Sequence, residues 1–323
     1  MQAGSRNKIA IRVVPVFFLF AGWAVAQLSQ QEQCGLAVVS DLLPANQRVC
    51  DPKFVATMAR SERVLEQSQL GIAAMLVIGP EYNAKSAWKS LQKAARHGET
   101  ASQVNLAVMY LNGWGTPVDS KAALQWLHKA ADQGFARAYF DLGILSLEGW
   151  GVPQDYAEAV QWFEKGAAAN DSFAQSNLGY MYDQGLGVAR NAQLAASSYR
   201  QAAEAGNPLG QSNLADMYLR GEGVAQSYPE AFRLFQKAAA QGQTTACLKL
   251  GYMYANGWGT TKDPQAAYTW IVSANLAGDQ RGKEMLASLE AILTPQQIAD
   301  ASNRANHQHA QGGQEVAAKS FLP

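Results

Sequence analysis

The sequence predicts an all-α protein, an α-solenoid of antiparallel helix pairs. Three observations lead to this fold class: a Gly-x-Gly element recurs every 36 residues, a Leu column recurs before it, and an Ala column recurs after it. The five elements are Gly113/Gly115, Gly149/Gly151, Gly185/Gly187, Gly221/Gly223 and Gly257/Gly259. A fixed period of this length is typical of repeat proteins, in which each unit buries its apolar face against its neighbours.

Residues 1–26 have the pattern of a secretory signal peptide. The cations Arg6, Lys8 and Arg12 precede a short apolar stretch, and Ala24–Ala26 offers a small-x-small cleavage site. That stretch is shorter than the roughly 20 residues that a spanning helix needs. We expect cleavage after Ala26 and a periplasmic or secreted product without stable membrane insertion, with a retained anchor as the alternative.

Charge and cysteine content narrow the function classes. The chain has 26 cations and 26 anions, and removal of residues 1–26 leaves 23 cations and a net charge of about −3, which does not favour nucleic acid. Residues 27–61 are expected to form an N-terminal cap region. Cys34 and Cys50 in it are predicted to form a disulfide in an oxidising compartment, with free thiols as the alternative. Cys247 is expected to be a small buried residue.

The first predicted helix of each unit ends at the leading glycine, which adopts the left-handed conformation at little cost. Seven positions before it stands a leucine followed by a tiny residue: Leu106-Ala107, Leu142-Gly143, Leu178-Gly179, Leu214-Ala215 and Leu250-Gly251. Four positions after the leucine lies a tyrosine in four repeats and Ser146 in the other. A second helix can approach such a face closely.

The second predicted helix begins after an N-cap residue: Asp119, Asp155, Asn191, Ser227 or Asp263. Asp155 with Glu158, and Ser227 with Glu230, also have the spacing of a capping box. The helix carries the column Ala123, Ala159, Ala195, Ala231 and Ala267, and four positions later Leu127, Phe163, Tyr199, Phe235 and Ile271. It ends at Gly134, Asn170, Gly206, Gly242 or Gly278.

The ends of the repeat array are less regular. A weaker copy without Gly-x-Gly precedes the five units, so residues 62–278 are interpreted as six repeats, the first degenerate. Residues 279–304 are predicted to form C-terminal capping helices, with Met285, Leu286, Leu289 and Ile292 at helical spacing and a short helix starting at Thr294-Pro295. Residues 305–323 are expected to be a disordered tail.

The repeat resembles a known family. The segments NLGYMYDQGLGV, residues 177–188, and KAALQWLHKAA, residues 121–131, are similar to the Sel-one-like (SLR) repeat, a relative of the tetratricopeptide repeat. The resemblance implies a right-handed α-solenoid and points to exported adaptors that bind other proteins. Cysteine-rich members have been assigned penicillin-binding or β-lactamase-like activity, but they carry a cysteine pair in each repeat, which this chain lacks.

The first helices offer a candidate binding surface. In repeats of this kind they line the concave wall. The face away from the Leu/Tyr core changes charge, size and aromaticity from one repeat to the next, as expected of a surface shaped for an irregular partner or of a merely solvated face. The predicted contacts, here called the concave stripe, are Asn105, Arg137, Asp141, Phe173, Asn177, Tyr180, Asn213, Asp216, Lys249 and Tyr252. Its asparagines are candidates for hydrogen bonds to an extended peptide.

Other candidate functional residues can also be interpreted as purely structural. Trp114, Trp150 and Trp258 stand between the turn glycines, where they either pack on a neighbouring turn or form an aromatic patch for a partner. Ser86 begins a Ser-x-x-Lys pattern but lacks the companion motifs of a serine acyl-enzyme. His307 and His309 have no nearby Cys or clustered carboxylate, so no metal site and no cofactor is predicted.

The function predicted from the sequence is that of an exported, non-catalytic scaffold. Its concave groove is expected to hold a protein or peptide partner and so to assemble or regulate a cell-envelope complex. The alternative is a β-lactamase-like or cell-wall peptide hydrolase.

Overall fold

The computed structural model describes the backbone of residues 84–319 and the side chains of residues 84–308. This part of the chain holds thirteen α-helices, one 3-10 turn and no strand, which confirms the all-α prediction. The first helices of the repeats are α6 (Thr100–Asn112), α8 (Ala136–Glu148), α10 (Ser172–Gln184), α12 (Pro208–Arg220) and α14 (Thr244–Asn256). The second helices are α7 (Ser120–Asp132), α9 (Tyr156–Ala168), α11 (Ala192–Glu204), α13 (Tyr228–Ala240) and α15 (Pro264–Leu276).

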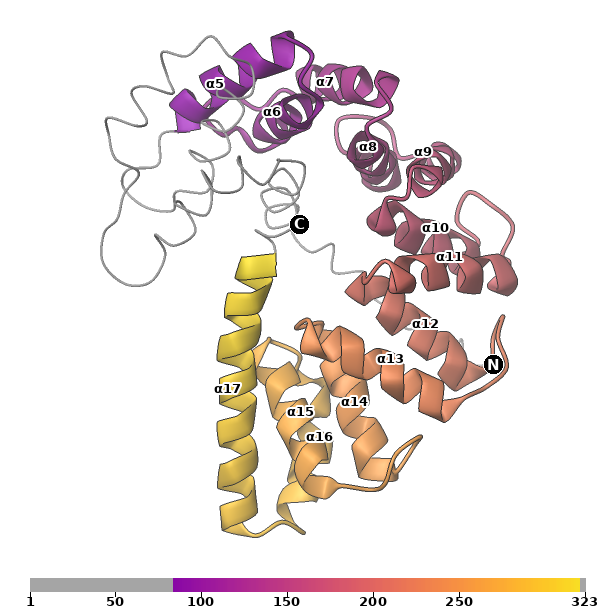
Figure 1. Cartoon of the computed structure of the whole chain (residues 1–323), viewed down its shortest axis with the longest axis vertical. Helices are drawn as coiled ribbons and strands as arrows, with labels where there is room; N and C mark the ends of the chain where they lie inside the picture. Colours follow the sequence, from indigo (N-terminus) through magenta and orange to yellow (C-terminus); the bar gives the residue numbers. More distant parts are fainter. Residues whose placement is uncertain (1–83, 320–323) are drawn as a thin grey trace, which may run out of the picture.

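The helix pairs stack in chain order along a curved arc (Figure 1). One further second helix, α5 (Ala84–Arg96), precedes them, and η1 (Gln280–Gly282), α16 (Lys283–Glu290) and α17 (Pro295–Lys319) follow. From α5 to α16 each α-helix packs on the next one, α17 packs on α15, and α10 also contacts α8 and α12. In Figure 1, α6 and α8 lie on the inner side of the arc and α7 and α9 on its outer side. Contact between successive first helices is expected where they form the inner wall of a curved stack.

The two glycines of each Gly-x-Gly element have different tasks. The leading glycine caps the first helix in the left-handed conformation, as at Gly185 with φ +68°. The second glycine is also left-handed, but a Cβ there would collide with the first residue of the preceding repeat's second helix; at Gly187 it would meet the carbonyl of Tyr156. The second glycine therefore serves a contact between repeats as well as the turn.

The predicted N-caps are confirmed. Asp119, Asp155, Asn191, Ser227 and Asp263 each accept a hydrogen bond from an amide in the first turn of the helix that follows. Their own amides donate to the Tyr/Ser column of the first helix, as Asp155 N does to the Ser146 carbonyl at 2.8 Å. The two glutamates of the predicted capping boxes accept hydrogen bonds from other side chains instead of the N-cap amide. Glu158 accepts from Trp162 Nε1, and Glu230 accepts from Arg233.

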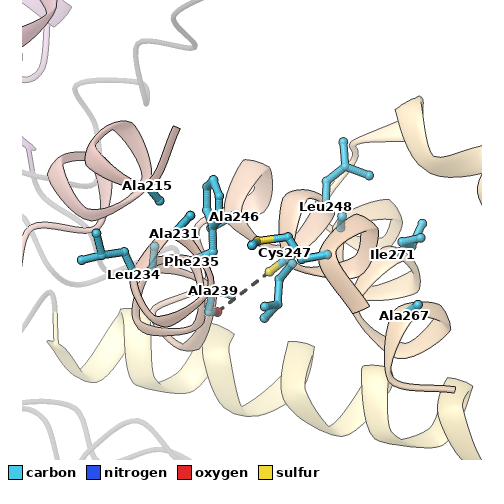
Figure 2. Close-up of a cluster of buried hydrophobic side chains, with 14 of the residues drawn as sticks. Ala215, Ala231, Leu234, Phe235, Ala239, Ala246, Cys247, Leu248, Ala267 and Ile271 are labelled. Atoms are coloured by element: carbon cyan, nitrogen blue, oxygen red, sulfur yellow. Dashed lines mark hydrogen bonds between the residues drawn. The ribbon is translucent and has the colours of Figure 1, made fainter. Parts of the chain in front are cut away.

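The core lies between the two helices of each pair and continues from one repeat to the next, as in the cluster that runs from α11 to α17. The Ala column is fully buried, and the tiny residue of the first helix faces the large one of the second: a Cβ on Gly143 would meet the ring of Phe163, and one on Gly179 the ring of Tyr199. Figure 2 shows a buried cluster between successive repeats, in which Cys247 on α14 is buried as predicted and its Sγ donates to the Ala239 carbonyl on α13 at 3.9 Å. Burial raises the pKa of this thiol to about 12.

The C-terminal end differs in part from the prediction. Thr294 and Pro295 begin a helix as expected, and the Thr294 hydroxyl accepts from Gln297 N at 3.3 Å. That helix is not short, and the disordered tail predicted from residue 305 was wrong for residues 305–319, because α17 runs to Lys319. Ala301 and Ala305 are fully buried on the face of α17 that packs on α15. The sequence of this segment has few large apolar residues, so its composition did not indicate a packed helix. Ile292, predicted to pack, is 64% exposed in the turn after α16.

Several predictions lie outside the described residues: the signal peptide (1–26), the N-terminal cap region (27–61) with its Cys34–Cys50 disulfide, and the first helix of the degenerate repeat. Within residues 84–319, no helix combines the length and apolarity needed to cross a bilayer.

Candidate functional site

The concave stripe lies on the first helices of the five repeats, which hold it at a spacing of one helix pair per step. Its members fall into two groups. Asn105, Arg137 and Asp141 are buried, whereas the other seven keep part of their surface exposed. The stripe remains a prediction as a binding site. The three buried members shape the wall, and the seven exposed ones are the residues that a partner would touch.

Arg137 and Asp141 form an ion pair on α8, one turn apart. Arg137 Nε donates to Asp141 Oδ1 at 3.1 Å, and only 2% of the Arg137 surface is exposed. The guanidinium lies over the rings of Phe140 and Phe173, with its carbon 4.8 Å and 5.6 Å from their centroids. Because Phe173 belongs to α10, this cation–π contact joins two successive first helices.

The ion pair lies in a buried acidic setting. Burial raises the pKa of Asp141 from 3.8 to about 7, although the Arg137 guanidinium opposes the shift. Burial also raises the pKa of Asp171, the N-cap of α10, whose carboxylate accepts from Ala174 N at 2.8 Å. The two raised pKa values predict that the wall between α8 and α10 responds to pH.

The three stripe asparagines do not form a uniform row. Asn105 is buried, while Asn177 and Asn213 are partly exposed. Asn177 Nδ2 donates to the Phe173 carbonyl of its own helix at 2.8 Å, so its Oδ1 is the atom that can accept a partner's hydrogen bond. The sequence offered three asparagine side chains for hydrogen bonds to an extended peptide. Two of them, Asn177 and Asn213, are accessible to such a partner.

The C-terminal half of the stripe links neighbouring repeats. Lys249 Nζ on α14 lies 3.0 Å from Asp216 Oδ1 on α12, and both side chains are partly exposed. The Tyr252 hydroxyl donates to the Arg281 carbonyl of η1 at 3.2 Å. Tyr180 on α10 packs against two apolar clusters, one formed by α8, α9 and α10 and the other running from α11 to α17. These side chains are thus held in place before any partner binds.

A set of charges that the sequence prediction missed lies at the turn edge. Asp183 and Glu222 bind Arg190 and Arg220 in a charged quartet: Glu222 Oε2 is 3.1 Å from Arg190 and 3.4 Å from Arg220, and Asp183 lies 3.8 Å and 3.5 Å from the same two. Comparison of the same position in successive repeats could have indicated this quartet. The position of Asp183 holds Leu111, Leu147, Leu219 and Ala255 in the other repeats, so a buried acid there departs from the pattern.

The turn tryptophans are not equivalent. Trp258 is stacked on Tyr228 of the preceding repeat, with ring centroids 6.0 Å apart, which supports a role in repeat contacts. Trp114 is partly buried against the first apolar clusters. Trp150 and Trp258 nevertheless remain 43% exposed, and an aromatic patch for a partner stays a prediction.

The candidates for catalytic or metal chemistry gain no support. Ser86 and Lys89 lie exposed on α5, around the partly buried Trp88. Among the described residues, no group of three or more His, Cys, Asp or Glu side chains is arranged to hold a metal ion.

Comparisons with known proteins agree with this architecture. A family model described as Sel1 repeat matches five consecutive 36-residue units: 100–135, 136–171, 172–207, 208–243 and 244–279. No protein of curated function is significantly similar to the chain.

Two solved structures are similar over most of the chain. The first is a protective antigen of uropathogenic Escherichia coli strains displaying an SLR fold, with 31% identity and a TM-score of 0.64 over 90% of this chain. The chain spans 64% of that protein's length. The second is a Sel1 repeat protein from Oxalobacter formigenes, with 28% identity and a TM-score of 0.62 over 76% of this chain and 97% of that one. The stacked helix pairs, the Gly-x-Gly contacts between repeats and the five matched units together show that this chain belongs to the Sel1 repeat family.

Proposed function

We propose that this protein is an exported, non-catalytic scaffold that binds a protein or peptide along its concave stripe and so assembles or regulates a cell-envelope complex. Sel1 repeats typically mediate protein–protein interaction, which supports a binding role. The observation that carries the proposal is the contrast between columns. The core columns hardly vary among the repeats, whereas the stripe columns differ in charge, size and aromaticity, apart from the recurring asparagines, and seven of the ten stripe residues are partly exposed.

The exposed part of the stripe defines the chemistry of the partner. Phe173 and Tyr180 offer apolar surface on α10, and Asn177 offers an acceptor oxygen beside them. Further along, Lys249 and Asp216 offer one charge of each sign. An extended segment with a large apolar side chain and free backbone amides fits this order, since hydrogen bonds would fix its register and the aromatic contacts would supply affinity.

Export is the second part of the proposal. It rests on the signal-peptide pattern of residues 1–26, and the similarity to a protective antigen is in keeping with it. Fractionation of cells that produce the tagged full-length chain tests it. We expect a product shortened by about 26 residues in the periplasm or the medium. A full-length product confined to the cytoplasm would contradict export.

The binding proposal is tested by isolating the partner and measuring its affinity for variants. Affinity purification from an envelope extract of the producing cells should yield one stoichiometric protein. Asn177→Ala and Lys249→Ala should each weaken its binding at least several-fold with unchanged helical content, because each loses a contact on the stripe. Arg200→Ala is the matched control, since Arg200 is exposed on the second helix α11. Equal affinity of the stripe variants and the control would refute the stripe as the binding face.

A further inference from the structure

In two of the repeats, a glutamine near the start of the first helix connects two neighbouring second helices by hydrogen bonds. Gln103 on α6 donates through Nε2 to the Ala95 carbonyl near the end of α5, at 3.1 Å. Its Oε1 accepts from Nε2 of Gln133, the C-cap of α7, at 2.9 Å. One side chain thus joins the C-terminal ends of two successive second helices. We call this arrangement the glutamine clasp.

The clasp recurs three repeats further on. Gln211 on α12 donates to the Ala203 carbonyl of α11 at 3.4 Å and accepts from Gln241, the C-cap of α13, at 2.9 Å. In the last repeat Cys247 takes the glutamine's place, and its thiol makes only the first of the two bonds (Figure 2). The clasp therefore needs a glutamine at both positions, 30 residues apart.

The repeat built from α10 and α11 has half of a clasp. Gln175 stands at the clasp position of α10, but its partner position at the C-cap of α11 is Ala205, whose side chain has no donor. Gln175 is 6% exposed, and its Oε1 accepts no hydrogen bond from any residue that the structure describes. A buried acceptor in this state is costly and favours a ligand that donates to it.

A pocket opens at this point. Its volume is about 570 Å³, and its lining includes Ala167, Asn170, Gln175, Gln201, Glu204 and Ala205. Gln175 is the buried residue of this set, while Asn170, Gln201, Glu204 and Ala205 are exposed. None of the lining residues belongs to the concave stripe. The pocket thus lies beside the position that the second glutamine takes in the clasped repeats. Gln175 Oε1 is itself covered, so a ligand in the pocket reaches it once the Gln175 side-chain amide turns toward the lining.

The electrostatics of the pocket favour a cation. The C-terminal ends of α9 and α11 contribute to its wall, and a helix C-terminus carries partial negative charge. Glu204 adds a carboxylate, and the lining contains no Lys or Arg. The remaining polar groups, on Asn170, Gln175 and Gln201, each have an amide oxygen that accepts hydrogen bonds. A flat cation with several donors suits this set better than a compact ammonium, because it can donate to separate acceptors at once.

We propose that the pocket between α9, α10 and α11 binds the guanidinium group of an arginine, with Gln175 Oε1 and the Glu204 carboxylate as its acceptors. The chemistry is the same whether the arginine is a side chain of a partner protein or a free amino acid. This site is independent of the concave stripe, so the proposal for one site can be correct while the proposal for the other is wrong.

The first test is an NMR titration of the full chain with capped arginine, N-acetyl-arginine N-methylamide. We expect saturable shifts of the Gln175 and Gln201 side-chain amide signals. Capped citrulline, which has nearly the same shape without the charge, should bind at least ten-fold more weakly. Free arginine distinguishes the sources: weaker binding than the capped form indicates a partner's side chain, and equal or tighter binding indicates the amino acid. Absence of saturable shifts with both arginine probes would refute the site.

Two variants provide the second test. Ala205→Gln restores the second half of the clasp, so it should fill the pocket, abolish the shifts and leave the fold intact or more stable. Ala277→Gln is the matched control, because it makes the same change at the C-cap of α15, away from the pocket. Glu204→Gln should weaken capped arginine at least ten-fold without affecting the fold. Wild-type affinity in either Ala205→Gln or Glu204→Gln would overturn the proposal.

Discussion

The contact between repeats at the second glycine can be tested with Gly187→Ala. Gly187 has φ +66°, and a Cβ there would collide with the carbonyl of Tyr156 at the start of α9. The left-handed conformation costs an alanine about 1–2 kcal/mol. Overpacking against rigid backbone adds about 1–3 kcal/mol. We therefore expect the free energy of unfolding to fall by about 2–5 kcal/mol, as measured by urea denaturation followed by far-UV circular dichroism.

Gly206→Ala isolates the steric part of this effect. Gly206 is also left-handed, with φ +84°, but no atom lies within 4 Å of where its Cβ would be. Its substitution should cost only the conformational part, about 1–2 kcal/mol. Both glycines flank the same helix, α11, so the two variants probe the same region of the stack. Equal losses in the two variants would show that Gly187 serves the turn alone, and the proposed role of the second glycine would be wrong.

Two further predictions follow from single contacts. Because burial raises the pKa of Asp141 from 3.8 to about 7, the folded state binds a proton that the unfolded state releases, so this carboxyl's stabilising contribution should decline as pH rises from about 4 to 7. Denaturation at several pH values should show a steeper decline for wild type than for Asp141→Asn, and parallel profiles would contradict this. Trp258→Ala should lower the thermal midpoint more than Trp150→Ala, because Trp258 stacks on Tyr228; the reverse order would favour packing at Trp150.

Most of the fold could be predicted because every repeat has the same residue types at the positions that make the same contacts. The small residue of the first helix and the large residue of the second stand in fixed columns, and the close approach of Gly143 to the Phe163 ring shows why the first column stays small. N-caps and left-handed C-caps depend on a few neighbouring residues, so Asp155 and Gly185 were readable without any knowledge of tertiary structure.

Features that depend on contact between repeats were not predictable in the same way. The burial of Arg137 follows from how closely α8 and α10 approach each other, which the curvature of the whole stack decides. The helix beyond residue 305 continues a segment that packs on α15 and buries Ala301 and Ala305, a contact that no local pattern indicated. The glutamine clasp joins positions 30 residues apart, so its loss at Ala205 became visible only once the helices were placed in space.

Site-specific photo-crosslinking in living cells tests most directly whether the inner wall of first helices binds a partner. A photoreactive phenylalanine analogue would replace Tyr180 on the concave stripe or Arg200 on α11, one residue in each experiment. We predict that the Tyr180 position yields one discrete adduct with the partner identified by affinity purification, and that the Arg200 position yields none. An adduct of equal yield from Arg200, or from Arg200 alone, would contradict binding at the inner wall.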